Sequence, residues 1–332
     1  MTDMTLVGPW VRRFLMEHLI GERNLTRNTQ ASYRDALVLM LPFAAAHVGL
    51  PIERLSLEHL SPELIRSFLL YLEQQRECSV ATRNQRLAAI HAFAHFIGER
   101  SPEHLSWCSK IRAVPFKKTS RPIMSYLDKP EMDTLLDTPN STTKQGMRDY
   151  ALLLFLYNTG ARADEAARVT VNDLNFDSSS SVSISGKRGK IRICPLWDLT
   201  ANTLQSLIAG RKDGQQVFLN CRDQAITRFG VNAIVKRYVL KASKKVSSLS
   251  SKRVSTHTIR HTTAVHLLRA GVDINTIRAW LGHVSLDTTN IYAEVDLEMK
   301  AKALAHCEIF TPEESTKHWN DQPDLMAFLK AL

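Results

Sequence analysis

Cysteine is scarce in this 332-residue chain, and the few cysteines present are not paired. The five thiols are odd in number and form no CxxC motif: Cys78, Cys108, Cys194, Cys221 and Cys307. A disulfide framework needs paired cysteines, and a cysteine-rich zinc site needs them at close spacing. The pattern therefore argues against both and indicates reduced thiols inside a cell.

Long hydrophobic runs are also missing. The longest run, from Tyr150 to Tyr157, is far shorter than the roughly 20 apolar residues that cross a bilayer as a helix. The N-terminus lacks the basic segment, apolar run and small-residue cleavage site that a secretory signal would show. We expect a cytoplasmic protein without a membrane partner.

Positive charge, in contrast, is abundant. Lys and Arg number 43 against 33 Asp and Glu, which gives a net charge of +10 and a pI near 9.4. A basic surface attracts polyanions, and nucleic acid is the commonest of these. The charge alone also fits a basic protein with no such partner. The length allows two domains, each with its own core.

Residues 4–113 are predicted to be helical. Apolar residues recur at helical spacing in four segments, and cap or turn residues separate them, such as Gly49 and the pair Ser61 and Pro62. No stretch in this region alternates as a strand would. These features predict a small bundle of four helices, which forms a first domain at residues 1–113.

The fourth of these helices begins with polar residues that suit phosphate. Thr82, Arg83, Asn84 and Arg86 cluster at its start, where backbone amides are unpaired and arginine can join them. We predict that these four residues contact DNA. The alternative is an ordinary solvated helix end.

The composition becomes basic and proline-containing from Ser109 to Arg121. This change predicts an extended connector, with residues 114–122 as the linker between two domains. Lys117 and Lys118 would contact DNA where the linker crosses it. A merely solvated linker is the alternative.

The second domain, residues 123–310, is predicted to be rich in helices, including an amphipathic one at 296–305. Its clearest β feature is a pair of runs, 181–185 and 191–194, joined by a glycine-containing turn. A polar tail at 311–332 ends in apolar residues. The whole chain is expected to be mainly α with a small β-hairpin or sheet.

Side chains of the second domain suit attack on a phosphodiester. Arg162 and Arg260 can each grip two phosphate oxygens with a rigid fork that stays charged. Glu165 lies one helical turn after Arg162, and His257 lies one turn before Arg260, so each can lie beside its arginine. This set could neutralise the phosphate and handle a proton.

Two further residues extend this set. His283 follows Gly282, where backbone can approach a ligand closely, and Tyr292 places a hydroxyl nucleophile nine residues later. Each residue alone has an ordinary explanation, since a tyrosine is usually a core residue and an arginine beside a glutamate is often a surface ion pair. Their joint occurrence indicates chemistry on a phosphodiester.

Taken together, the motifs resemble those of the tyrosine recombinases, or phage integrase family. The matching segments are Thr159-Gly-Ala-Arg162-Ala-Asp-Glu165, Gly186-Lys187, His257-Thr-Ile-Arg260-His261, Leu281-Gly-His283 and Ile291-Tyr292. The resemblance covers about residues 5–310. It implies that the first domain is the family's helical core-binding domain and the second its α-rich catalytic domain.

The resemblance implies roles for the central residues. Tyr292 would attack the phosphate and keep a 3′-phosphotyrosyl link. Arg162 and Arg260 would clamp the non-bridging oxygens and stabilise the transition state, with Glu165 in support behind them. His257 would act as general acid or base.

The same resemblance covers the hairpin turn and the second histidine. His283 would donate a hydrogen bond to the phosphate, and Lys187 would protonate the leaving 5′-oxygen. Lys190 is a rival for Lys187 because both reach the same side, and Lys187 is favoured because it occupies the family's Gly-Lys position. Arg188 stands where the family often has glycine, and both Arg188 and Lys190 are expected to contact DNA.

Partners and cofactors follow from the family chemistry. The covalent link conserves the energy of the phosphodiester, so strand exchange in this family needs neither ATP nor a metal. The chain has no P-loop and no acidic metal cluster, and we expect no cofactor. The implied partners are double-stranded DNA with paired recombination sites, a homo-tetramer in the synaptic complex (monomer or dimer when free) and accessory recombinases. The protein would be associated with the nucleoid.

Two other functions fit part of the sequence pattern. Residues 267–281 have the helix, glycine turn and second helix of a helix-turn-helix regulator, which binds DNA without catalysis. A type IB topoisomerase shares the chemistry of the family. A regulator would not need Tyr292, His257 and Arg162 together. The bundle joined to a catalytic domain favours a recombinase that acts in integration or transposition of a mobile element.

Overall fold

The computed structural model describes residues 5–118, 125–177, 179–186 and 189–282. The chain forms two compact units, Met1–Arg121 and Pro122–Leu332. None of the helices in the described ranges is both long and apolar enough to cross a membrane. Several predictions lie outside the described residues: those for Lys187, Arg188, His283, Tyr292, the helix at 296–305 and the tail at 311–332.

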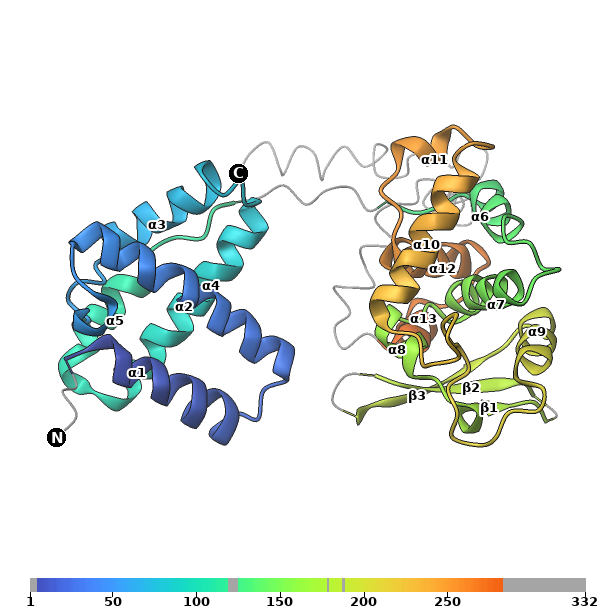
Figure 1. Ribbon diagram of the computed structural model, residues 1–332, viewed down its shortest axis with the longest axis horizontal. Helices are drawn as coiled ribbons and strands as arrows, with labels where there is room; N and C mark the ends of the chain where they lie inside the picture. Colours follow the sequence, from blue (N-terminus) through green and yellow to red (C-terminus); the bar gives the residue numbers. More distant parts are fainter. Residues whose placement is uncertain (1–4, 119–124, 178, 187–188, 283–332) are drawn as a thin grey trace, which may run out of the picture. The chain divides into compact units, whose positions relative to one another are not determined.

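The first unit is a bundle of helices (Figure 1). Its α-helices are α1 (Val7–Arg13), α2 (Arg27–Val48), α3 (Pro62–Gln74), α4 (Val80–Arg100) and α5 (Leu105–Arg112). A π-helical segment, Phe14–Glu22, continues α1, and short 3₁₀ turns follow α2 and α4. Trp10, Phe14, Phe68 and Phe93 are fully buried and form the centre of its core.

Side-chain caps set the starts of these helices. Ser61 Oγ accepts a hydrogen bond from the Leu64 amide at 3.2 Å, with proline at the first helical position of α3. Ser79 Oγ accepts one from the Thr82 amide at 3.3 Å at the start of α4. Each serine thereby satisfies one of the amides that a helix start leaves unpaired.

The prediction of four helices is wrong by one, because α5 is a fifth. It includes Lys110 and Arg112, which the basic composition assigns to the extended connector. Cys108 and Ile111 on the same helix are buried in the bundle core. Tertiary packing of these two residues therefore keeps the segment helical, and the extended part of the chain begins later.

The second unit contains eight α-helices and three strands within the described residues (Figure 1). The helices are α6 (Lys129–Leu136), α7 (Lys144–Thr159), α8 (Ala163–Arg168), α9 (Asp198–Ile208), α10 (Arg228–Ala242), α11 (Ser248–Ser251), α12 (Thr256–Arg269) and α13 (Ile274–Leu281). The strands are β1 (Leu174–Asn175), β2 (Ser181–Ser185) and β3 (Ile191–Pro195). They form one antiparallel sheet in the order β1-β2-β3.

The sheet has one buried face and one exposed face. Val182 and Ile184 of β2 are buried, and the helices of the unit lie over this face (Figure 1). Ile191 and Ile193 of β3 are 68% and 69% exposed. The predicted hairpin is thus confirmed, with a short third strand added to it, and so is the mainly helical fold class.

Helix α7 is the central element of the second unit. Every residue from Ala151 to Thr159 is buried, as expected of a helix that is apolar all round. It starts at Thr143, whose hydroxyl accepts from the Gly146 amide at 3.0 Å, and it ends at Gly160 with a φ of 59°. Because α9 and α12 pack against it, its end is a fixed point for the residues that follow.

Candidate active site

Arg162 follows the end of α7 and caps α8. Its amide donates to Glu165 Oε2 at 3.0 Å, and its guanidinium Nη1 donates to Glu165 Oε1 at 2.6 Å. The side chain of Glu165 is 3% exposed, whereas that of Arg162 is 29% exposed. The buried carboxylate therefore fixes one edge of the guanidinium while the arginine still faces solvent.

Glu165 also binds Arg192, a residue of β3. Arg192 Nη2 donates to Glu165 Oε2 at 2.8 Å, and its Nε donates to the Trp280 carbonyl at 2.8 Å. Burial alone would raise the pKa of Glu165. The hydrogen bond and charge of Arg192, with those of Arg162, outweigh burial and lower that pKa to about 2. Glu165 is therefore a carboxylate at neutral pH, bound by two arginines.

Arg260, on α12, is held in a different way. Only 3% of the residue is exposed. Its Nη1 donates to the Gly160 carbonyl at 2.6 Å, and its Nη2 donates to the Leu281 carbonyl at 2.5 Å. These carbonyls lie at the C-terminal ends of α7 and α13, where a helix carries partial negative charge. The guanidinium thus joins two helix ends.

Two glycines allow these groups to approach each other. Gly160 and Gly282 have φ angles of 59° and 66°, which side chains rarely adopt. A Cβ at Gly160 would collide with the Leu281 side chain, and one at Gly282 would come within 3.2 Å of Arg192 Cδ. Both positions are therefore limited to glycine by conformation and by space.

His257 lies in the first turn of α12, on the protein surface. Partial loss of hydration lowers the pKa of His257, the charges of Arg260 and Arg162 lower it further, and Glu165 raises it. His261, one turn later, is more enclosed, and this burial, followed by His257 and Arg260, lowers its pKa to about 4. The lowered pKa values favour the neutral form of both imidazoles at pH 7.

Two buried polar residues of the second unit were not predicted from the sequence. Arg192 is one, although its place in the hairpin was a signal: it alternates with Ile191 and Ile193 and so points to the buried face with Cys194. A charge on a buried face needs a partner. Asn158 is the other. It is fully buried, donates to the Pro195 carbonyl at 3.1 Å and accepts from the Trp197 amide at 2.9 Å.

The predicted DNA-contacting residues of the first unit lie together near the start of α4. Arg83 donates to the Pro115 carbonyl at 3.2 Å. The Asn84 side chain and the Lys117 backbone exchange two hydrogen bonds, at 2.8 and 3.1 Å. Lys117 Nζ also pairs with Glu73 at 2.8 Å. The first residues of the connector are therefore bound to the bundle.

The remaining predicted contacts lie as follows. Thr82 shares a hydrogen bond of 3.0 Å with Ser79, and Arg86 donates to the Ser32 carbonyl at 3.2 Å. Lys118 and Lys190 are exposed, and the Lys190 carbonyl accepts a hydrogen bond from the Gly186 amide at 2.7 Å. In the described part of the chain, no three His, Cys, Asp or Glu side chains are grouped so as to hold a metal ion.

Comparisons with known proteins match both halves of the chain. Residues 125–299 match the Phage integrase family, and residues 11–100 match the Phage integrase N-terminal SAM-like domain. The integrase/recombinase y4rC of Sinorhizobium fredii is 35% identical over 334 residues, which cover 100% of both chains. The tyrosine recombinase XerC of Pelobacter propionicus is 33% identical over 313 residues, which cover 91% of this chain and 97% of the relative.

Solved structures share the fold at lower identity. The Tn1549 transposon integrase in complex with transposon right end DNA has a TM-score of 0.69 at 17% identity, covering 89% of this chain and 98% of the other. The XerH recombinase bound to difH substrate in a pre-cleavage complex has a TM-score of 0.65 at 20% identity, covering 88% and 83%. At these identities the similarity concerns the fold alone.

Proposed function

We propose that this chain, which belongs to the phage integrase family of tyrosine recombinases, cuts and rejoins DNA strands through a covalent bond to Tyr292. Members of this family are site-specific DNA recombinases. The observation that carries the proposal is the placement of two arginines at the end of α7, where Arg162 bonds to Glu165 and Arg260 bonds to the Gly160 carbonyl. The full-length similarity to a relative named as an integrase supports a role in a mobile element.

In the proposed reaction the two arginines bind the scissile phosphate. A guanidinium offers two parallel donors that match two phosphate oxygens. Glu165 holds one edge of the Arg162 guanidinium, and the Arg162 side chain is still 29% exposed. The guanidinium can therefore bind an oxygen of the phosphate from the solvent side. Fixed donors of this kind stabilise the charge that develops in the transition state.

The covalent step transfers the phosphate to the enzyme. The Tyr292 oxygen attacks phosphorus and gives its proton to His257, whose lowered pKa leaves it neutral to accept it. The bond from phosphorus to the 5′-oxygen breaks, and Lys187 protonates that oxygen. A 5′-hydroxyl of the partner strand then reverses these steps. One phosphodiester is exchanged for another, so no energy source is consumed.

The test is a covalent adduct on a nicked DNA duplex that traps the first step. Tyr292→Phe is expected to bind this DNA as tightly as the wild type but to form no adduct, because only the hydroxyl is lost. Tyr71→Phe, in the first unit, is the matched control and should form the adduct normally. An adduct that persists in Tyr292→Phe and maps to another residue would contradict the assignment.

The alternative function is a helix-turn-helix regulator, and the same adduct assay distinguishes it from a recombinase. Helices α12 and α13 do have that connectivity, with Gly271 in the turn. The C-terminal carbonyls of α13, at Trp280 and Leu281, bind Arg192 and Arg260. This use of α13 inside the cluster supports catalysis. A regulator would bind DNA and give no adduct with any variant.

We also propose that the chain acts as a tetramer on paired DNA sites, with the end of one chain docked on its neighbour. Apolar residues Leu325, Met326, Phe328 and Leu329 lie near the end of the sequence, preceded by Asp321 and Asp324. A cavity of about 470 Å³ on the second unit offers a complementary surface. It is lined by Tyr157, Trp197, Leu267 and Ala270, with Lys129 and Arg269 alongside.

Truncation tests this docking. Removing residues 311–332 is expected to abolish assembly on paired sites while cleavage at a single site survives. Trp197→Ala should weaken assembly in the same way, since Trp197 is 41% exposed beside the cavity and presents apolar surface to the tail. If the truncated chain still completes strand exchange at the normal rate, the docking proposal is wrong.

A further inference from the structure

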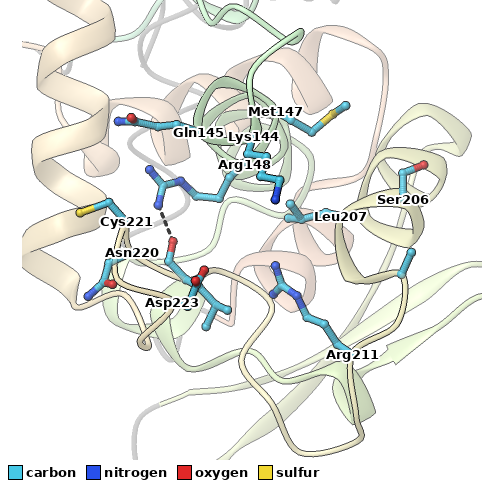
Figure 2. A pocket seen from close by; sticks show the side chains of 12 residues that line it. Lys144, Gln145, Met147, Arg148, Ser206, Leu207, Arg211, Asn220, Cys221 and Asp223 are labelled. Atoms are coloured by element: carbon cyan, nitrogen blue, oxygen red, sulfur yellow. Dashed lines mark hydrogen bonds between the residues drawn. The ribbon is translucent and has the colours of Figure 1, made fainter.

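A second cationic cluster surrounds a cavity of about 630 Å³ at the opposite end of α7 (Figure 2). Its lining includes Lys144, Arg148, Arg211 and Asp223. Lys144 begins α7 and Thr159 ends it, so the helix separates this cavity, the distal pocket, from the candidate active site by about 22 Å at 1.5 Å per residue. The proposed recombination chemistry makes no use of it.

Arg148 forms a rigid wall of the distal pocket. It is only 9% exposed. Its Nε donates to Asp149 at 2.6 Å, and its Nη1 donates to the Leu219 carbonyl (Figure 2). Asp149 also accepts from the Tyr238 hydroxyl at 3.0 Å. The loop that carries Leu219 is thereby tied to α7, which gives the pocket a preformed shape.

The other two cations, Lys144 and Arg211, are held differently from Arg148. Arg211 Nη1 donates to the carbonyls of Gln216 and Val217 at 3.0 and 2.6 Å. Burial lowers the pKa of Arg211, although the charge of Asp223 opposes this. Within the described ranges neither Lys144 nor Arg211 forms a salt bridge, and both side chains extend toward the same hollow in Figure 2. Asp223 is the one carboxylate among the lining residues.

We propose that the distal pocket binds a small molecule that carries a phosphate group. Lys144 and Arg211 supply two positive charges for a phosphate, and the nearby start of α7 adds its positive end. An anion held between them would relieve the repulsion of like charges in a partly enclosed space. The pocket volume lies within the range of roughly 300–1,000 Å³ that is common for small-molecule sites.

The remaining lining suits the organic part of such a ligand. Met147, Leu207 and Leu219 supply apolar surface. Asn220 Oδ1 accepts from the amides of Arg222 and Gln224 at 2.8 and 3.1 Å, which fixes the orientation of this side chain and leaves its amide nitrogen as a donor. A phosphate joined to an apolar or aromatic group, as in a nucleoside monophosphate, matches this combination.

The thiol of Cys221 provides a local probe, because it is exposed and lines the distal pocket. The full-length protein is treated with iodoacetamide, and alkylation at Cys221 is followed by mass spectrometry. Adenosine 5′-monophosphate and inorganic phosphate should slow this alkylation in a saturable manner, and adenosine should not. Phosphate bound between Arg162 and Arg260 would leave Cys221 unaffected, so the readout is specific to this site.

Variants separate the distal pocket from a general effect of charge. Lys144→Gln combined with Arg211→Gln should weaken protection by at least about tenfold, the loss of roughly 1.4 kcal/mol of binding. Lys212→Gln, an exposed neighbour outside the lining, should change nothing. Because Arg211 also binds backbone carbonyls, Lys144→Gln alone is the second variant if the double variant does not fold. Protection is compared as the ratio of rates with and without ligand.

Several results would overturn the proposal. These are absence of saturable protection, equal protection in Lys144→Gln and wild type, and equal protection by adenosine. Protection by duplex DNA but not by adenosine 5′-monophosphate would likewise overturn it and assign the cations to the DNA backbone. None of these measurements requires recombination, so the outcome is independent of the proposed function.

Discussion

Arg162 and Arg260 are the same residue type at one site, yet the chain holds them by opposite means. Arg162 is 29% exposed in its side chain and bound to the carboxylate of Glu165 at 2.6 Å. Arg260 is 3% exposed and bound to the carbonyls of Gly160 and Leu281. The guanidinium of Arg162 forms an ion pair with a carboxylate, whereas that of Arg260 donates hydrogen bonds to the ends of two helices.

The difference separates two tasks that arginine can perform. Glu165 neutralises part of the charge of Arg162 but leaves it accessible, so its loss should affect chemistry more than folding. Arg260 satisfies carbonyls that are buried with it, and a buried carbonyl without a donor destabilises the fold. Substitution of Arg260 should therefore affect both.

The largest effect is expected for Arg260→Lys. Lysine keeps the charge but cannot reach the Gly160 and Leu281 carbonyls in the same fork geometry. One buried carbonyl left unpaired costs about 1–3 kcal/mol of unfolding free energy, and loss of one transition-state donor costs roughly 10²–10³ in cleavage rate. Denaturant unfolding and single-turnover cleavage measure the two. Unchanged stability would show that Arg260 does not join the helix ends.

Arg162→Lys should give a similar loss of rate with a smaller loss of stability. Removing one donor of this kind slows cleavage by roughly 10²–10³. The partly exposed side chain leaves no buried carbonyl unpaired, and Arg192 still binds the Glu165 carboxylate. Arg168→Lys is the matched control, since Arg168 lies on α8 in an exposed ion pair with Asp164. Cleavage within a factor of about three of wild type would place Arg162 outside the chemistry.

Glu165→Gln tests the ion pair of Arg162 through the pH dependence of stability. The folded pKa of Glu165 is about 2, against an ordinary value of 4.5. Its ionised form therefore stabilises the fold at neutral pH, and this contribution is lost as the pH falls from about 5 toward 2. Wild type should lose about 2 kcal/mol more than Glu165→Gln between about pH 6 and pH 3. Parallel stability curves for the two proteins would refute the shared ion pair.

The smallest effect concerns His257. Arg162 lowers the pKa of His257 and Glu165 raises it. Arg162→Gln should therefore raise this pKa, and Glu165→Gln should lower it, which NMR titration of the imidazole can follow. Since a depressed histidine pKa means that the fold prefers the neutral ring, protonation at low pH opposes folding. If the pKa of His257 shifted in the same direction in both variants, the charges of Arg162 and Glu165 would not be what sets it.

Local features of the fold could be predicted from the sequence because they depend on neighbours along the chain. Caps such as Ser61 and Ser79, and the end of α7 at Gly160, follow from hydrogen bonds within a few residues. The proximity of Arg162 and Glu165 has the same origin, since three residues make about one turn. The hairpin followed from alternation in two adjacent runs.

Other features were decided by the tertiary structure alone. Helix α5 is basic at its end and is kept in the bundle by the burial of Cys108 and Ile111. Arg192 bonds to Glu165, 27 residues before it, and to Trp280, 88 residues after it. These partners lie too far apart along the chain for a local sequence pattern to pair them.

The sequence by itself therefore determined which residues could act on a phosphate and which segments would carry them. The orientation of those residues was determined only when distant segments packed together. Arg260 reaches Gly160 across 100 residues because α12 packs against α7. Its bonds to two helix ends exist only in the folded chain, since buried donors and acceptors must find partners wherever packing places them.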